Sequence, residues 1–428
     1  MNIRAFVFWC IDFLRGKRIR KSYNFIFQTI YNGGNNKKQL DEILDWAINN
    51  IPFYKKYKGY NSIKDFPIID KNIIRKNEDD FLAPSFDKET LFKEETSGST
   101  GTPFVVYQDK QKRLRAAADT IAFSQFAGYN FGTKLYYSRV WNNHNKKTSL
   151  QSKIQNIVMQ DSNKLSNEEL ETFLKKLEND SSEKSVLIFA SSLTALNQYM
   201  DNYNRKTSAK ISCFITMSES LPKGVRKGIE EKFRTTVVSR YSNCECGIIA
   251  QQCPSEDEYH INTASFYVEL LKLDSNEAAG YGEPGRIVVT DLYNKAMPLI
   301  RYDTGDVGIM SDKSSCGKGS PVFTRIDGRR IDCIYSTKGE MMSPYIINNT
   351  LWYYRELNQY QFVQNGENDY LLKLNIDNKS FLRENELLND IKKYIGEDAN
   401  IKIEYIDEIP LLASGKRKQV VNNYIKNK

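Results

Sequence analysis

Apolar runs and amphipathic patterns alternate through the middle of the chain. The runs Val186–Ala190, Ile211–Met217 and Thr236–Ser239 are typical of buried strands. A helical pattern follows each of the first two runs, one reaching Tyr203 and the other covering Pro222–Phe233. Strands joined by crossover helices form parallel sheets, which bind ligands at the carboxyl ends of their strands. The pattern therefore predicts a parallel α/β core with a site at that edge.

The regions on either side of this core have different patterns. Residues 20–90 mix helical segments with short loops, and closely spaced strands follow over Tyr259–Met310. Beyond Gly328 the pattern becomes strand, helix and strand, over Tyr370–Ile376, Glu384–Ile395 and Ile401–Ile406. We therefore predict an α/β protein whose large N-terminal domain, residues 1–329, combines parallel α/β sheets with a β-rich subdomain and begins with about 90 largely helical residues. A small mobile α+β lid domain, residues 330–428, completes the chain.

The composition is that of a globular protein. Of 428 residues, 40% are hydrophobic and 27% are charged, which is enough to bury a full core. The net charge of +8 is modest for this length and suits anionic ligands such as nucleotides. There is no zinc-finger spacing and no dense stripe of Lys and Arg, so the sequence does not predict nucleic acid binding.

The N-terminal segment Ile3–Leu14 is apolar but too short to span a bilayer. Basic residues follow it at once, so the helix could rest weakly on an anionic membrane surface or pack on the main domain. The seven scattered cysteines are a poor disulfide framework, and no secretory signal is visible. These features favour a cytoplasmic protein. The sequence gives no indication of the oligomeric state.

A loop rich in glycine and hydroxyl residues precedes the strand that begins at Phe104. It comprises Thr96, Ser97, Gly98, Ser99, Thr100, Gly101, Thr102 and Pro103. Its glycines allow backbone N–H groups to approach phosphate oxygens, and its hydroxyls add donors. The Lys-Ser/Thr pair of a Walker A loop is missing, and a run of this kind alone is often an ordinary loop.

Four further motifs follow the loop in order. They are Tyr241-Ser-Asn-Cys-Glu245, Arg301-Tyr-Asp-Thr-Gly-Asp306, Gly328-Arg329 and Ser414-Gly-Lys416. Together with the loop they resemble the motifs of the adenylate-forming superfamily of acyl-CoA synthetases and adenylation domains. Within it, the basic aromatic N-terminus and the segment Cys253–Glu269 are similar to the phenylacetate–CoA ligase-like branch found in capsule and surface-polysaccharide gene clusters.

This resemblance implies roles for individual residues. Residues 96–102 would hold the ATP phosphates, with Thr100 among the catalytic residues. Glu245 would hold Mg²⁺, a hard cation that prefers carboxylate oxygen. The nucleotide would contact Ser218, Glu219, Tyr241, Ser242, Asp306 and Arg329, with Tyr241 stacked on adenine, Ser218 and Glu219 along the base and Asp306 on the ribose. Lys416 would neutralise charge developing between the carboxylate and the α-phosphorus.

Some motif positions depart from the family pattern. Ser242 stands where Gly is usual and Cys244 where Thr is usual, which weakens or removes one contact to the α-phosphate. Asp303 replaces an Arg, and the usual hinge Asp falls at Ile331, with Asp332 one residue later. These departures leave the expectation of ATP binding in place, and the one at the hinge falls on the part of the pattern that serves the thioester-forming half-reaction, which relies on hinge rotation.

Three residues form a second constellation. Cys253, His260 and Cys316 have the spacing of a structural zinc site, and Cys246 is a candidate fourth ligand. Relatives often carry a Cys two residues before the last of these, where this chain has Ser314. Buried free cysteines are the alternative interpretation.

We expect the protein to activate a carboxylic acid with ATP, release pyrophosphate and pass the acyl group on, by default to coenzyme A. Transfer to an amine or a sugar during surface-polysaccharide assembly is one alternative. A degenerate relative that only binds a nucleotide is another. The sequence does not identify the acid, although Arg139, within the aromatic segment Tyr136–Trp141, could face a second carboxylate or a sugar.

Overall fold

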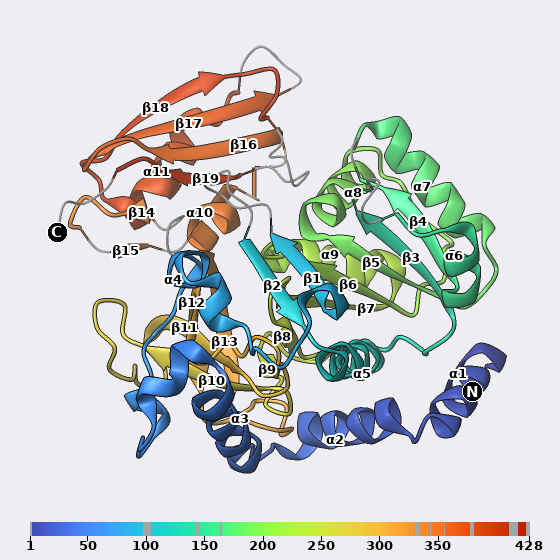
Figure 1. The fold of residues 1–428 in the computed structure, drawn as a ribbon. Coiled ribbons are helices and arrows are strands. Elements are labelled where there is room, and N and C mark those ends of the chain that lie inside the picture. Colours follow the sequence, from blue (N-terminus) through green and yellow to red (C-terminus); the bar gives the residue numbers. More distant parts are fainter. Residues whose placement is uncertain are drawn as a thin grey trace.

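The fold is built around one long mixed sheet and a separate small one. A computed structural model describes residues 2–96, 104–139, 141, 146–162, 165–329, 334–339, 341–342, 344–351, 353–354, 356–376, 381–410 and 418–424. The large sheet has eleven strands in the order β10-β11-β12-β13-β9-β8-β7-β6-β5-β3-β4, and the small one has four in the order β18-β17-β16-β19. Figure 1 shows the C-terminal strands above the large sheet, and α1, α2 and α3 along the opposite edge.

The parallel half of the large sheet matches the predicted α/β core. Its strands are β3 (Lys134–Arg139), β4 (Ile157–Asp161), β5 (Lys184–Phe189), β6 (Cys213–Met217) and β7 (Thr236–Asn243), which pair parallel with one another. The helices around them are α5 (Lys110–Phe126), α6 (Ser149–Gln155), α7 (Asn167–Asn179), α8 (Ala190–Asn202) and α9 (Lys223–Phe233). Strand β3 had no counterpart in the sequence prediction.

The antiparallel half continues the same sheet instead of forming a separate one. Its strands are β8 (Gly247–Gln252), β9 (Tyr259–Ile261), β10 (Phe266–Leu271), β11 (Pro284–Asp291), β12 (Tyr302–Ser311) and β13 (Val322–Arg329). The switch from parallel to antiparallel pairing occurs between β7 and β8, which are joined by a tight turn at Cys244–Cys246. Residues of the predicted nucleotide site lie at or beside this switch.

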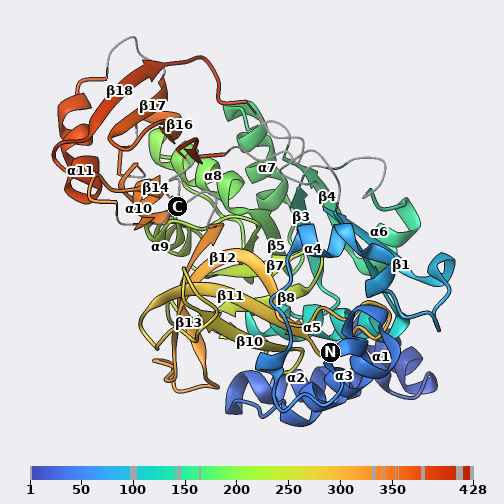
Figure 2. The ribbon, with the colours of Figure 1, turned by 60° about the vertical axis from the view of Figure 1, so that its left-hand side comes forward.

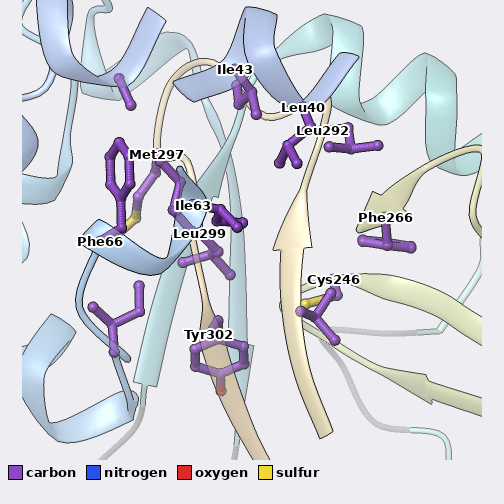
Figure 3. Packing of buried hydrophobic residues seen from close by; sticks show 14 of the residues in the cluster. Leu40, Ile43, Ile63, Phe66, Cys246, Phe266, Leu292, Met297, Leu299 and Tyr302 are labelled. Carbon is purple, nitrogen blue, oxygen red and sulfur yellow. The ribbon is translucent and has the colours of Figure 1, made fainter. Parts of the chain in front are cut away.

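The N-terminal region packs its apolar residues against the antiparallel half. It contains α1 (Ile3–Leu14), α2 (Arg18–Asn32), α3 (Lys37–Asn50), α4 (Lys71–Lys76) and the 3₁₀ turns η1 (Pro52–Tyr57), η2 (Ile63–Asp65), η3 (Glu78–Phe81) and η4 (Lys88–Thr90). Leu40 and Ile43 of α3 belong to one buried cluster with Leu292, Met297 and Tyr302 (Figure 3). Burying such side chains contributes about 1.5–3 kcal/mol each, so this region is integral to the large domain.

A short hairpin carries the predicted phosphate loop. Strands β1 (Phe92–Thr96) and β2 (Phe104–Gln108) pair antiparallel, with Thr96 opposite Phe104. The connection between them, residues 97–103, lies outside the described residues. The hairpin therefore fixes both ends of this loop.

The small unit has its own core. Strands β16 (Leu357–Gln364), β17 (Asp369–Ile376), β18 (Asn400–Tyr405) and β19 (Val420–Asn422) form its sheet, with α10 (Pro344–Leu351), α11 (Glu384–Ile395) and the pair β14 (Ile334–Tyr335) and β15 (Met341–Met342). Its buried apolar residues form a cluster separate from those of the large sheet. The predicted fold class, with a large α/β part and a small α+β unit, is confirmed.

Candidate functional site

Two residues predicted to contact the nucleotide meet at the switch point of the large sheet. Tyr241 lies on β7, and its hydroxyl donates a 2.7 Å hydrogen bond to Asp306 Oδ2 on β12. Thr304 Oγ1 lies 3.3 Å from the same hydroxyl. Burial, and then the charge of Asp306, hold the pKa of Tyr241 well above its usual range, so the phenol stays protonated and donates. The structure thus brings Tyr241 and Asp306 together across 65 residues of sequence.

Glu245, the predicted magnesium ligand, is a buried carboxylate with two partners. Its Oε1 lies 3.0 Å from Lys71 Nζ and accepts a 2.6 Å hydrogen bond from the Tyr302 hydroxyl. The Glu245 side chain is only 2% exposed, whereas that of Lys71 is 33% exposed. Burial, and then the Glu245 charge, raise the pKa of Tyr302 well above its usual range. Sequence reasoning did not identify Lys71 or Tyr302 as members of the site.

The turn that carries Glu245 is held from beneath. Lys112 Nζ donates a 2.7 Å hydrogen bond to the carbonyl of Cys246 and forms a fully buried ion pair with Asp291 at 2.6 Å. Asn243 Oδ1 accepts a 2.7 Å hydrogen bond from the Cys246 amide. These contacts fix the backbone of the turn and therefore the position from which the Glu245 side chain extends.

Lys71 reaches Glu245 because its segment is hydrogen-bonded to the start of β12. The Ile69 amide donates to the Arg301 carbonyl at 3.1 Å, and the Asp303 amide donates to the Ile69 carbonyl at 2.8 Å. The buried Arg301 guanidinium donates to the carbonyls of Lys64 and Phe66. It also pairs with Glu269 through two nitrogens, at 3.1 and 3.0 Å. Lys71 follows Ile69 by two residues and is therefore placed beside the sheet edge.

Ser218 and Glu219 lie at the carboxyl end of β6, as predicted. Ser218 has φ of 74°, a left-handed conformation that a residue with a side chain adopts only when its surroundings impose it. Glu219 Oε2 accepts a 2.9 Å hydrogen bond from the Ser191 amide in the first turn of α8, where a negative charge is favoured. Tyr360 of the small unit lies close enough for the Glu219 charge to raise its pKa, after the larger effect of burial. The small unit therefore reaches this edge of the large sheet.

Several predicted residues can be placed only in part. Ser97–Thr102 and Lys416 lie outside the described residues. Thr96 ends β1, and the backbone of Arg329 ends β13 opposite Asp306, so this position is beside the predicted ribose contact. Ser242 lies on β7 at an irregularity in the pairing with β8.

The predicted zinc ligands form a compact cluster away from the switch point. One ligand atom each from Cys253, His260 and Cys316 lies within 4.8 Å of the other two. Cys316 Sγ is 3.3 Å from His260 Nε2, and the other ring nitrogen of His260, Nδ1, is 3.1 Å from the Gly319 carbonyl. A hydrogen bond from Nδ1 to a carbonyl is the usual support of a metal-ligating histidine, because it directs the Nε2 lone pair at the metal.

The turn that carries Cys316 is organised by a buried carboxylate. Glu258 accepts hydrogen bonds from the hydroxyls of Ser314 and Ser315 and from the amides of Ser315 and Cys316. Burial alone would raise the pKa of Glu258, but these hydrogen bonds outweigh it and lower the pKa to about 2. Ser314, which occupies the position where relatives often have a ligating Cys, is therefore engaged by Glu258, and its Oγ also lies 3.1 Å from Cys316 Sγ.

Cys246, the candidate fourth ligand, is not grouped with these three residues among those that the structure describes. Its fully buried thiol belongs to the hydrophobic cluster of the N-terminal region (Figure 3). Burial, and then the charge of Glu245, hold the pKa of Cys246 well above its usual range, which disfavours the thiolate that zinc requires. Cys246 precedes β8, whereas Cys253 follows it.

Both the small unit and the chain as a whole are similar to known proteins. Residues 334–423 match the CapK C-terminal domain family. This match covers most of the small unit. The chain is also 24% identical over 410 residues to protein CapK of Staphylococcus aureus, a match that covers 90% of this chain and 88% of CapK.

Solved structures show the same fold. A 2-hydroxyisobutyryl-CoA ligase in its post-adenylation state superposes with a TM-score of 0.71 at 15% identity, over 90% of this chain and 88% of the ligase. The amide bond synthetase McbA of Marinactinospora thermotolerans superposes with a TM-score of 0.55 at 14% identity, over 77% of this chain and 68% of McbA. The predicted resemblance to adenylate-forming enzymes is confirmed at the level of the fold.

Proposed function

We propose that this protein activates a carboxylic acid with ATP. The acid carboxylate would attack the α-phosphorus, forming an acyl-adenylate as the bond to the β-phosphate breaks and pyrophosphate leaves. The observation that carries the proposal is the convergence of Tyr241, Asp306 and Glu245 at the switch point of the sheet, where open α/β sheets bind ligands.

The contacts of these residues suit a nucleotide. The Tyr241 ring would stack on adenine, and Asp306 would accept hydrogen bonds from the ribose hydroxyls. The hydrogen bond that the Tyr241 hydroxyl donates to Asp306 Oδ2 would orient this carboxylate before the sugar binds. Residues 96–102 and Lys416 remain the predicted phosphate contacts and catalytic lysine.

Glu245 is chemically suited to hold Mg²⁺, since carboxylate oxygen is the donor that this cation prefers. The buried carboxylate already has a counterion in Lys71. We therefore propose that magnesium bound with ATP would replace Lys71 at Glu245. Bound there, the ion would neutralise charge on the phosphates.

The end of β3 has the character of an anion-binding wall for the acid. Arg139 ends this strand, and its guanidinium lies 5.6 and 5.5 Å from the ring centroids of Tyr137 and Trp141. Burial, and then the charge of Arg139, lower the pKa of Lys147, so the two cations are close to each other. Two neighbouring cations favour an acid that carries a second negative or strongly polar group.

The acyl acceptor follows less directly from the fold. Coenzyme A is our default, as in the phenylacetate–CoA ligase-like branch to which we assign the chain. The similarity to McbA, an amide bond synthetase, favours keeping an amine as an alternative acceptor. The resemblance to the branch found in capsule and surface-polysaccharide gene clusters also keeps a sugar as an alternative acceptor of the acyl group.

A screen for acid-dependent pyrophosphate release tests the proposal. Aryl acids, amino acids, uronic acids and dicarboxylic acids should be compared, with Glu245→Gln as the inactive control. Acid-dependent release in the wild type supports acid activation, and adding coenzyme A then distinguishes thioester formation from transfer to another acceptor. ATP binding without release or exchange with any acid would favour a degenerate nucleotide-binding protein.

We further propose a structural zinc ion at Cys253, His260 and Cys316. Two sulfurs and one imidazole nitrogen within 4.8 Å are a chemically appropriate donor set for tetrahedral zinc. The site would fasten the turn at Cys316 to β9, which carries His260. We also propose that the protein has two domains, residues 1–329 and 330–428, and that it is located in the cytoplasm.

A further inference from the structure

Helix α1 has two apolar faces, and only one of them is covered. The inner face places Ala5, Phe8 and Trp9 against the large domain. Phe8 and Trp9 lie 5.0 and 5.8 Å from the ring centroid of Phe131, and Asn2 Nδ2 donates to the Phe131 carbonyl at 3.0 Å. The predicted packing of this helix on the main domain is therefore present, and it fixes which face points outward.

The outward face is a continuous apolar stripe. We define the α1 stripe as Ile3, Phe6, Val7, Ile11 and Leu14, all of which are exposed. Their spacing of three and four residues places them in one row on the helix surface. Ile3 and Leu14, at the two ends of the row, are each 83% exposed. Phe13, also exposed, borders the stripe.

The charges around the stripe have one sign. Residues 2–21 contain six basic residues (Arg4, Arg15, Lys17, Arg18, Arg20 and Lys21) and one acidic residue, Asp12, which gives a net charge of 6 − 1 = +5. All six basic residues are exposed. Asp12 is buried, and its carboxylate accepts hydrogen bonds from the amides of Ile19 and Arg20 at the start of α2. The exposed charged side chains of residues 2–21, which adjoin the stripe, are therefore all basic.

The cations gather at the end of α1 and the start of α2. Lys17 Nζ lies 4.6 Å from the ring centroid of Phe13, and Arg20 lies 4.5 Å from that of Trp9. An apolar row with basic side chains beside it is the arrangement of helices that lie in a membrane interface. We propose that α1 docks this protein on an anionic lipid surface, with the stripe among the acyl chains and the basic residues at the head groups.

The fold is compatible with such docking. Twelve residues of helix span about 18 Å, less than the roughly 30 Å of a bilayer core, so α1 would lie on the surface. No helix among the described residues has the length and apolarity needed to cross a bilayer. Figures 1 and 2 both place α1 and α2 at one edge of the molecule, with the small unit at the opposite side. Docking would therefore leave the small unit away from the membrane.

Flotation of the full-length protein with vesicles tests this proposal. We expect binding to vesicles of phosphatidylglycerol and phosphatidylcholine in equal amounts, much weaker binding to phosphatidylcholine alone, and weaker binding in high salt. Phe6→Ser with Leu14→Ser should reduce partitioning about a hundredfold, since each removes a buried apolar side chain from the interface. Replacing Arg15, Lys17 and Arg18 by Gln should also reduce it about a hundredfold, at about fivefold per charge.

Matched variants separate docking from general effects. Leu382→Ser with Ile154→Ser changes two exposed apolar residues elsewhere, which are 94% and 66% exposed, and should leave flotation unchanged. The Phe6/Leu14 variant should keep wild-type pyrophosphate exchange, so failure of the proposed function and failure of docking are distinguishable. Absence of flotation, equal binding to uncharged vesicles, or a wild-type dimer that the Phe6/Leu14 variant dissociates would each overturn the proposal.

Discussion

Replacing Lys71 by Met should make ATP binding more dependent on magnesium. Lys71 Nζ lies 3.0 Å from Glu245 Oε1 and supplies the counterion of that carboxylate. If magnesium is to use Glu245, this ion pair must open first. Removing the lysine removes the competing cation, and the carboxylate then gains its counterion only when magnesium arrives with ATP.

The exposure of the two side chains sets the magnitude. Exposed ion pairs contribute up to about 1 kcal/mol, whereas removing one partner of a fully buried pair costs about 3–5 kcal/mol. Glu245 is buried, but Lys71 is partly exposed and therefore partly screened by solvent. An intermediate value of about 2 kcal/mol corresponds to roughly a 30-fold change in an equilibrium constant.

Calorimetric titration with ATP, with and without Mg²⁺, measures this effect without knowledge of the acid. The ratio of the two affinities should rise about 30-fold in Lys71→Met and should not change when the same substitution is made in a Glu245→Gln background. Lys134→Met is a matched control, because Lys134 pairs with Asp180 at 2.7 Å and is similarly exposed. An unchanged ratio would refute the competition. Weaker ATP binding without metal would instead place Lys71 on the phosphates.

The remaining predictions concern the nucleotide, the catalytic lysine and the metal cluster. Asp306→Ala should weaken ATP binding by about 1.5–3 kcal/mol in the same titration, because it removes charged hydrogen bonds to the ribose, and unchanged affinity would contradict that role. Lys416→Ala should abolish pyrophosphate exchange while ATP still binds, whereas unaffected exchange would remove Lys416 from the mechanism. Elemental analysis should find about one zinc per chain, lost in Cys253→Ser and retained in Cys246→Ser. A zinc-free, fully active wild type would refute the metal site. The pKa of Glu258 is lowered from 4.5 to about 2, so its contribution to the stability of the fold is present above pH 4.5 and is lost as the pH falls towards 2. In thermal melting, the Glu258→Gln variant should therefore lose less stability than the wild type over this pH range.

Much of the large domain could be predicted because its strands are buried on both faces and read as short apolar runs. The runs at β5, β6 and β7 stand out in this way, and each is bounded by a helix pattern or a turn. Strand β3 was missed because it lies near the sheet edge, and its sequence KLYYSR has only a short apolar and aromatic stretch between polar residues. Tyr241 and Asp306 could be predicted for a different reason. They belong to a set of motifs that occur in a fixed order along the chain, and recognising such a set does not depend on local periodicity.

Lys71 shows where sequence reasoning stopped. Its contact with Glu245 spans 174 positions and depends on the hydrogen bonds of Ile69 to Arg301 and Asp303. Nothing near Lys71 marks it, because a lysine at the start of a short helix is ordinarily a solvated surface residue. The resemblance to a Tyr-Arg-Thr-Gly-Asp motif predicted a role for Asp306. It did not predict that Arg301 and Asp303, in the same motif, attach the N-terminal segment to the sheet through hydrogen bonds with Ile69.

The geometry of β8 separates Cys246 from the other three predicted metal ligands and also explains why those three meet. Six residues of β8 separate Cys246 from Cys253, and an extended strand rises about 3.3 Å per residue, so the two cysteines are about 20 Å apart at opposite ends of the strand. Cys253 and His260 meet because β8 and β9 are antiparallel neighbours, with Gln251 opposite His260. Cys316 joins them because its turn leads into β13, where Val322 pairs with His260. Spacing along the chain did not distinguish the three cysteines. Strand pairing brings Cys253 and Cys316 next to His260 and leaves Cys246 at the other end of β8.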